Sequence, residues 1–364
     1  MLYKPDWEKT KQKFIEYWSR ENHDRPLISI TGRRQDAKES VTKDPENVRD
    51  RWLDFEYVLK KARESFENTW FGGEAYPCFN PNLGPDIIGA MLGCDLEFGE
   101  YTSWSVHIVD DWQKFDHLKF DEENRWWKRI KRLTELAVQD AKGAYLVGIT
   151  DLHAGMDALV SMRGPENLST DLYDFPEEVK RANFQVLKVL KEAYDRLYNI
   201  TVQNLDGTSN WAGIWHPGRW YITSTDFICL ISPKMFEEFV LPELELELDW
   251  LDASIFHLDG PGALKHLDRL LEIPRLKGIQ WVYGAGQPTA SHWIPMLQKI
   301  QGKGKLIQID VKAGELGVML EALRPEGVLY MVSNDRPGSG GAFTEEEARD
   351  IMKRAEASYK RKLY

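Results

Sequence analysis

An alternation of short apolar runs with longer amphipathic segments is the feature that most constrains the fold of this chain. Apolar runs such as residues 144–149 and 328–333 have the length and composition of buried strands. Between the runs, apolar residues recur every three or four positions, as in the segment that begins at Pro176. About eight strands alternate with helices in this way, which favours an α/β fold of the (β/α)8 barrel (TIM barrel) type.

The predicted elements follow one another without a linker or an internal repeat. We therefore predict one domain over residues 1–364, with an N-terminal helical extension and with long loops, mainly residues 65–116, over the C-terminal mouth of the barrel. A doubly wound sheet is the alternative, but no glycine-rich dinucleotide turn follows an early strand. The predicted strands are residues 26–31, 75–80, 144–149, 219–224, 253–256, 276–283, 305–311 and 328–333.

Composition narrows the classes of partner. The net charge of -11 and the pI near 5.4 argue against nucleic acid and anionic membranes, and no run approaches the roughly 20 apolar residues of a membrane helix. The cysteines Cys78, Cys94 and Cys229 form no metal-binding spacing, and Cys229 is interpreted as a core residue. Sparse cysteines and an N-terminus without a signal-peptide core predict a cytoplasmic protein.

His257 and Asp259 are the strongest candidate site residues. They stand directly after the predicted strand 253–256, where that strand should end, and residues two apart on a strand point to the same face. The carboxyl ends of barrel strands carry the chemistry of such folds. The pair is therefore predicted to bind a metal ion or to act as an acid–base pair. The alternative is a structural histidine at the strand end with Asp259 capping the next helix.

Asp151 and His153 repeat this spacing after the predicted strand 144–149. We expect them at the same rim, where they would complete a site of four polar ligands with His257 and Asp259. The alternative is a loop pair with ordinary hydrogen bonds.

Other residues are predicted to bind the substrate. The last strand is followed by polar residues and then by a glycine-rich stretch, a combination that can hold phosphate or carboxylate in barrels, although a flexible turn explains it equally well. Aromatic residues, among 14 tryptophans, could form a wall for a flat ligand or could simply pack loops onto the barrel. The predicted substrate-binding residues from these observations are Tyr76, Asp226, Trp281, Asn334, Asp335 and Arg336.

The chain resembles the uroporphyrinogen decarboxylase superfamily, and within it a branch similar to corrinoid methyltransferases. The resemblance lies in four stretches: PDIIGAMLGCDLEFG, ISPKMFEEFVLP, FHLDGPGALKHL and VLYMVSNDRPG. It implies a (β/α)8 barrel, methyl-transfer or demethylation chemistry on a small substrate, a corrinoid carried by a partner protein, and a possible homodimer. Asp86 loosely matches a substrate-facing aspartate of that family; the alternative is an N-cap after Pro85.

The departures from the family restrict the activity. Arg33 and Arg34 stand near the arginine-rich loop of the decarboxylases but in a different pattern, and the late histidine of those enzymes is absent from SNDRPGSGG. Porphyrinogen decarboxylation is therefore not expected. The methyltransferases bind zinc through His-x-Cys and a later cysteine, whereas here Asp259 replaces the first cysteine and no cysteine follows Cys229. A nitrogen and oxygen site for zinc or a harder divalent metal remains possible at His257 and Asp259.

Three functions thus stay open from the sequence. The first is a methyltransferase-type enzyme with a metal at His257. The second is a carbohydrate-active lyase or hydrolase that uses the carboxylates of the barrel and a tryptophan-lined pocket. The third is a barrel that binds a ligand without catalysis.

Overall fold

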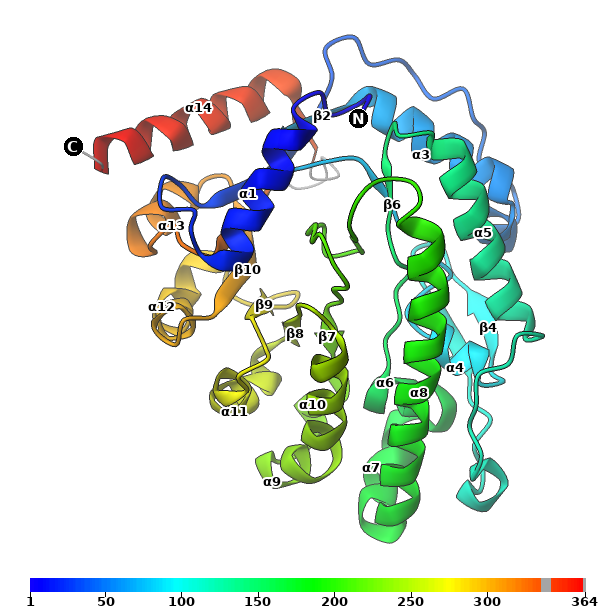
Figure 1. Ribbon diagram of the computed structural model, residues 1–364. Coiled ribbons are helices and arrows are strands. Elements are labelled where there is room, and N and C mark those ends of the chain that lie inside the picture. Colours follow the sequence, from blue (N-terminus) through cyan, green and yellow to red (C-terminus); the bar gives the residue numbers. More distant parts are fainter. Residues whose placement is uncertain (335–341, 363–364) are drawn as a thin grey trace.

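The computed structural model describes residues 1–334 and 342–362. A central, mostly parallel sheet is surrounded by helices, as Figure 1 shows. The strands are β1 Leu27–Arg33, β2 Thr69–Gly73, β3 Cys78–Phe79, β4 Asp95–Phe98, β5 Ser103–Val106, β6 Leu146–Val147, β7 Thr223–Ser224, β8 Ile255–Asp259, β9 Gly278–Val282, β10 Leu306–Lys312, β11 Val328–Ser333 and β12 Phe343–Thr344.

The α-helices are α1 Trp7–Ser19, α2 Val48–Leu53, α3 Phe55–Asn68, α4 Ile87–Met91, α5 Arg125–Ala141, α6 Gly155–Arg163, α7 Pro165–Asp174, α8 Pro176–Thr201, α9 Pro233–Met235, α10 Leu241–Trp250, α11 Leu267–Glu272, α12 Ile294–Gly302, α13 Leu316–Ala322 and α14 Glu345–Lys362. Shorter helical turns are η1 Trp112–Phe115, η2 Asp226–Leu230, η3 Phe236–Val240, η4 Pro261–His266 and η5 Ala290–Trp293. Helices α11, α12 and α13 lie outside strands β8 to β10 (Figure 1).

The main sheet has the strand order β12-β1-β11-β10-β9-β8-β7, and all neighbours along this path are parallel. Strand β2 pairs with β1 in the antiparallel sense, and β3 and β6 form a second parallel pair. The amide of Ile149, just after β6, donates to the carbonyl of Ser209 at 2.8 Å. The alternating α/β pattern is therefore confirmed, with the carboxyl ends of β7, β8 and β9 at one edge.

Several predicted elements are confirmed and others need correction. Strands β1, β9, β10 and β11 lie where the sequence predicts them, but β3, β6 and β7 are two residues long because only those residues form ladder pairs. The expectation that residues 65–116 are mainly loops is wrong. They contain β2, α4 and the antiparallel hairpin of β4 and β5, in which buried and exposed side chains alternate.

The helical segment before β8 begins at an N-cap, where the Ser232 hydroxyl accepts from the Met235 amide. A distortion follows as the π-helical turn η3, immediately before α10. Pro242, in the first turn of α10, has no N–H to continue an α-helical hydrogen-bond ladder, and this accounts for the wider turn that precedes it. No helix in the described part of the chain is both long and apolar enough to cross a bilayer.

Candidate metal centre

Three neighbouring strand ends supply the polar residues of the centre. His257 and Asp259 belong to β8, and Asp226 follows the adjacent strand β7 as the first residue of η2. Asp151 and His153 follow β6, on the segment that leads into α6. These ends lie close together: β7 and β8 are parallel neighbours, and the ligand atoms of His153 and Asp226 lie within 4.8 Å of each other.

The first group of ligands comprises Asp226, His257 and Asp259. Each offers one ligand atom, and these atoms all lie within 4.8 Å of one another. The Nε2 atom of His257 is 3.8 Å from Oδ1 of Asp226. Asp226 is 52 % exposed whereas His257 is 11 % exposed, so a buried nitrogen faces a carboxylate that solvent or substrate can reach.

A chain of side-chain amides fixes the orientation of His257. Gln308 donates from Nε2 to the Ala212 carbonyl at 2.6 Å, and its Oε1 accepts from Nε2 of Gln280 at 2.9 Å. This leaves Oε1 of Gln280 against Nδ1 of His257. A carbonyl can only accept, so the direction of every bond in the chain follows, and Nδ1 of His257 must carry the proton. In the neutral imidazole the lone pair is therefore on Nε2, which faces the carboxylates and suits a metal ligand.

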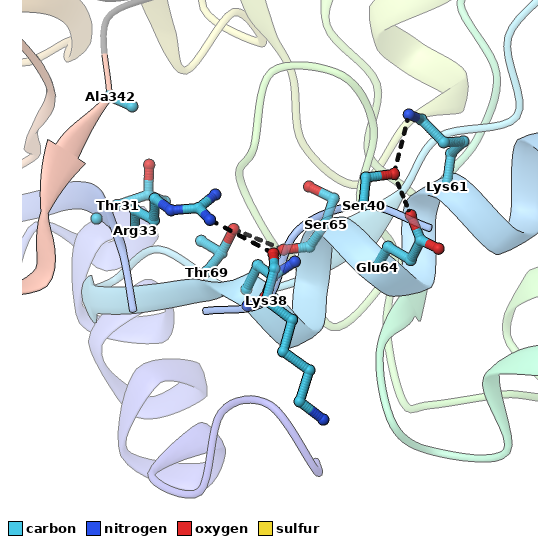
Figure 2. Close-up of a pocket in the computed structure, with 11 residues that line it drawn as sticks. Thr31, Arg33, Lys38, Ser40, Lys61, Glu64, Ser65, Thr69 and Ala342 are labelled. Atoms are coloured by element: carbon cyan, nitrogen blue, oxygen red, sulfur yellow. Dashed lines mark hydrogen bonds between the residues drawn. The ribbon is translucent and has the colours of Figure 1, made fainter. Parts of the chain in front are cut away.

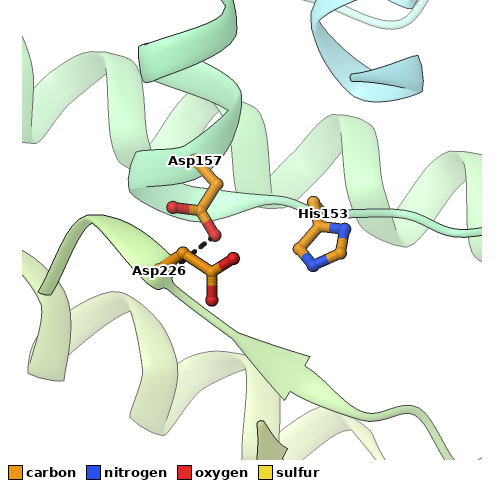
Figure 3. A group of neighbouring side chains, drawn as sticks. All are labelled: His153, Asp157 and Asp226. Atoms are coloured by element: carbon orange, nitrogen blue, oxygen red, sulfur yellow. Dashed lines mark hydrogen bonds between the residues drawn. The ribbon is translucent and has the colours of Figure 1, made fainter. Parts of the chain in front are cut away.

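The second group comprises His153, Asp157 and Asp226, whose ligand atoms also lie within 4.8 Å of one another. Figure 3 shows the imidazole of His153 turned toward the two carboxylates. On its other side, Nδ1 of His153 lies 2.8 Å from Oδ1 of Asp151. The predicted pair Asp151–His153 is thus in contact, and Asp226 is shared by both groups.

Asp157 is a residue of the centre that the sequence analysis missed. Its Oδ2 and Oδ1 atoms accept from the amides of Asp226 and Phe227 at 2.8 and 3.0 Å. The carboxylate therefore fixes the start of η2 and, with it, the backbone of Asp226. The signal available in the sequence was an acidic residue four positions after His153, in the first turn of a predictable helix.

The electrostatics of the centre favour a cation. Burial opposes the charged form of His153, but Asp151, with Asp157 and Asp226, outweighs it and raises the pKa of His153 to about 10. Burial and then the neighbouring Asp226 raise the pKa of Asp157 to about 6 and also raise that of Asp259. Within the described residues, these carboxylates and Asp151 form no ion pair with lysine or arginine.

Trp211 separates the two imidazoles. Its ring stacks near His153 with 6.0 Å between centroids and meets His257 edge-on at 5.3 Å. Trp211 is partly buried, whereas Trp215 and Trp220 of the same stretch are buried in the core. The tryptophan-rich stretch therefore mostly packs, and Trp211 alone of these three contacts the imidazoles of the centre.

Other predicted substrate residues have structural contacts. Tyr76 is buried, and its hydroxyl is 2.7 Å from Oγ of Ser209. The Asp86 carboxylate accepts from the Ser105 amide at 2.8 Å and so anchors the hairpin instead of capping α4. Trp281 follows Gln280 on β9 and therefore points to the opposite face, where it packs on Trp293. The structure does not bring these three residues into either ligand group.

The remaining predicted residues lie at the end of β11. Asn334 is buried, and its carbonyl accepts from Nζ of Lys312 at 3.3 Å. Asp335 and Arg336 lie outside the described residues. Cys229 is exposed on η2, so its interpretation as a core residue is wrong, and no cysteine joins either ligand group among the described residues.

A separate cavity of about 330 Å³ lies beside the carboxyl end of β1, against α3 (Figure 2). Arg33, Lys38 and Lys61 line it, and its acidic residue Glu64 accepts hydrogen bonds from the hydroxyls of Ser40 and Thr42. None of the residues of the two ligand groups lines this cavity.

No protein-family model matches the chain, and no curated protein matches it either. The resemblance described above therefore depends on its four sequence stretches alone.

Proposed function

We propose that this protein is a metal-dependent enzyme that carries out methyl transfer or demethylation on a small substrate, with a corrinoid protein as its partner. The observation that supports a metal most directly is the group Asp226, His257 and Asp259. In it, the direction of the amide chain leaves the Nε2 lone pair of His257 facing two carboxylates. The resemblance supports the reaction type and the partner.

The ligand set determines which metal is proposed. One imidazole nitrogen and two carboxylate oxygens suit zinc or a harder divalent ion such as manganese. The zinc–thiolate centre of the resembling methyltransferases does not fit here, because Asp259 stands where a thiolate would be. A bound divalent ion would supply Lewis acidity at the substrate atom that carries the methyl group. Asp226, which is half exposed, would face that substrate.

The proposal includes a closed (β/α)8 barrel in a cytoplasmic enzyme. Support for closure comes from the parallel order of the main sheet, from the parallel pair β3–β6, and from the Ile149–Ser209 hydrogen bond that extends from β6. Three free cysteines support a reducing compartment. In a barrel of this kind, the centre would lie at the mouth that carries catalysis.

Metal analysis of the purified protein tests the proposed centre. We expect a stoichiometric transition metal in the wild type and its loss in His257→Ala. The control is His23→Ala, since His23 is an exposed histidine that also lies beside a carboxylate, Glu326. Equal metal content in the wild type and in both variants would exclude this centre. So would the absence of bound metal in the wild type after reconstitution with Mn²⁺ or Zn²⁺.

A spectroscopic assay tests the reaction. The protein is incubated with cob(I)alamin and, in turn, a methyl ether, a methylated amine and a methyl thioether. We expect one of these three substrates to convert cob(I)alamin to methylcobalamin. The conversion should be lost in His257→Ala and retained in His23→Ala. A metal-loaded protein that gives no conversion with any class would contradict methyl transfer while leaving the metal centre standing.

A second candidate is a glycoside hydrolase or lyase. The ligand oxygens of Asp226 and Asp259 lie within 4.8 Å, close to the spacing of about 5 Å between the carboxyl groups of retaining glycosidases. Trp211, which contacts His257, offers a surface for a sugar ring. Hydrolysis of aryl glycosides that persists in the presence of a chelator would favour this candidate over the metal enzyme.

A further inference from the structure

Asp226 lies between two sets of ligands. His257 and Asp259 are on one side of it, and His153 and Asp157 are on the other. A carboxylate has two oxygens with about four lone-pair positions, so it can bind two cations at once. We propose that the centre takes two divalent cations, with Asp226 bridging them and with the second cation held by His153 and Asp157.

Each of the two histidines has an acceptor oxygen against Nδ1, with hydrogen-bond geometry at His257 alone. In each, Nδ1 faces an acceptor: Asp151 lies 2.8 Å from Nδ1 of His153, and Gln280 contacts Nδ1 of His257. An acceptor at the outer nitrogen orients the ring and increases the basicity of the inner nitrogen, as is usual for metal-bound histidines. Figure 3 shows the ring of His153 directed toward Asp157 and Asp226. An acceptor oxygen beside Nδ1 on both sides of Asp226 indicates two cations.

Asp157 is prepared for this role by the backbone. The amides of Asp226 and Phe227 occupy one lone pair on each of its oxygens and hold the carboxylate in place. Each oxygen keeps a further lone pair for a ligand. The same hydrogen bonds hold the backbone of Asp226, so the Asp157 carboxylate is oriented, and Asp226 is placed beside it, before any cation binds.

The charge of the centre suits bound cations. Asp151, Asp157, Asp226 and Asp259 bring four carboxylates together, and within the described residues none of them pairs with lysine or arginine. This arrangement leaves negative charge at the centre that divalent cations can balance. Two ions about 3.5–4 Å apart bind both sides of an oxygen-bearing group. The inference therefore extends the proposed function to a substrate with an alkoxide, carboxylate or phosphoryl oxygen.

Titration with Mn²⁺ alone tests the inference, which rests on the proposed metal-dependent function. Calorimetry and metal analysis of the wild type should give two equivalents per chain. Electron paramagnetic resonance should show two manganese ions coupled through the shared carboxylate. His153→Ala should bind one equivalent with the coupling lost, and His23→Ala should bind two.

The outcomes separate the two proposals. One equivalent in the wild type that remains in His153→Ala and disappears in His257→Ala overturns the second cation but keeps the metal enzyme. No bound Mn²⁺ in the wild type overturns both. If His153→Ala does not fold by circular dichroism, His153→Leu replaces it, because leucine fills the site without offering a ligand atom. Two coupled equivalents in that variant also overturn the role of His153.

Discussion

At the scale of single residues, the chain of hydrogen bonds from the Ala212 carbonyl to His257 determines which imidazole nitrogen is available to bind a metal ion. Gln308 and Gln280 lie on neighbouring strands at paired positions, as Gln280 and His257 do, so the three side chains share one face of the sheet. The chain of amides is buried, and leaving one of its members unpaired is costly. Gln280 is therefore a positioning residue for His257.

Gln280→Ala tests this role. It removes the acceptor at Nδ1 of His257, so the imidazole can rotate or protonate on Nε2, and we expect Mn²⁺ affinity at that centre to fall roughly 10- to 100-fold. The measurement is isothermal titration calorimetry. Gln298→Ala is the control, because Gln298 is a glutamine that donates to the Ala322 carbonyl at the end of α13, away from the ligand groups. Equal affinities in the two variants would show that Gln280 does not orient His257.

Glu247 is expected to make the stability of the folded protein depend on pH. Burial raises the pKa of Glu247 to about 8, against the opposing charge of Lys191. The folded protein thus keeps a proton that the unfolded chain releases near pH 4.5. This proton contributes stability that is complete below about pH 4.5 and is lost as the pH rises through about 8.

Glu247→Gln has no such proton to lose. We expect it to match the wild type near pH 5 and to be more stable near pH 8.5, by on the order of 2–4 kcal/mol in the free energy of unfolding. Denaturant titrations at both pH values measure the difference. Glu245→Gln, on the exposed side of the same helix, should follow the wild type. Parallel pH profiles for the wild type and Glu247→Gln would contradict the buried, protonated state.

The residues of the centre were predictable to different degrees. His257 and Asp259 follow from strand alternation, and Asp151 and His153 follow from their position after a strand. The sequence predicts Asp226 as a substrate-binding residue, whereas the structure shows it as the residue shared by both ligand groups. Its position depends on how η2 turns back over the strand ends, and that turn is held by a residue 69 positions earlier, Asp157. Such contacts between distant segments are not encoded in local spacing.

At the scale of elements, the start of the last helix is marked by a signal in the local sequence. Thr344 and Glu347 form a capping box before α14: the Thr344 amide donates to the Glu347 carboxylate, and the Glu347 amide donates to the Thr344 hydroxyl. The lengths of the strands, in contrast, do not follow from the local sequence. The apolar runs that contain β6 and β7 extend past their ladder pairs, because pairing needs a partner strand in register.

Thr344→Ala tests the capping box. It removes the hydroxyl that accepts from the Glu347 amide, and we expect a loss of about 1 kcal/mol in stability together with faster amide exchange in the first turn of α14. Thr344→Ser should retain the wild-type values. Thr170→Ala is the control, since Thr170 is exposed within α7, away from its N-cap. A stability for Thr344→Ala equal to that of the control would mean that packing alone holds α14.

At the scale of the whole molecule, the centre joins segments that are distant in sequence. Its ligands come from the segment after β6, from the start of η2 and from β8, so each depends on the parallel order of the strands. Like charges gathered there oppose the folded arrangement unless a cation compensates them. The carboxylates that suit a metal ion are therefore expected to lower the stability of the metal-free protein.

This expectation gives a test on the intact protein. A ligand that binds only the folded state stabilises it by about 2.7 kcal/mol at 100 times its Kd, so saturating Mn²⁺ should raise the Tm by several degrees, and a chelator should reverse the rise. Asp226→Ala removes the shared ligand and should abolish the response to Mn²⁺. It also removes one of the mutually repelling carboxylates, so its metal-free Tm should equal or exceed that of the metal-free wild type. A lower Tm without metal would instead mean that Asp226 stabilises the fold, and the case for a cation-dependent centre would fail at its shared residue.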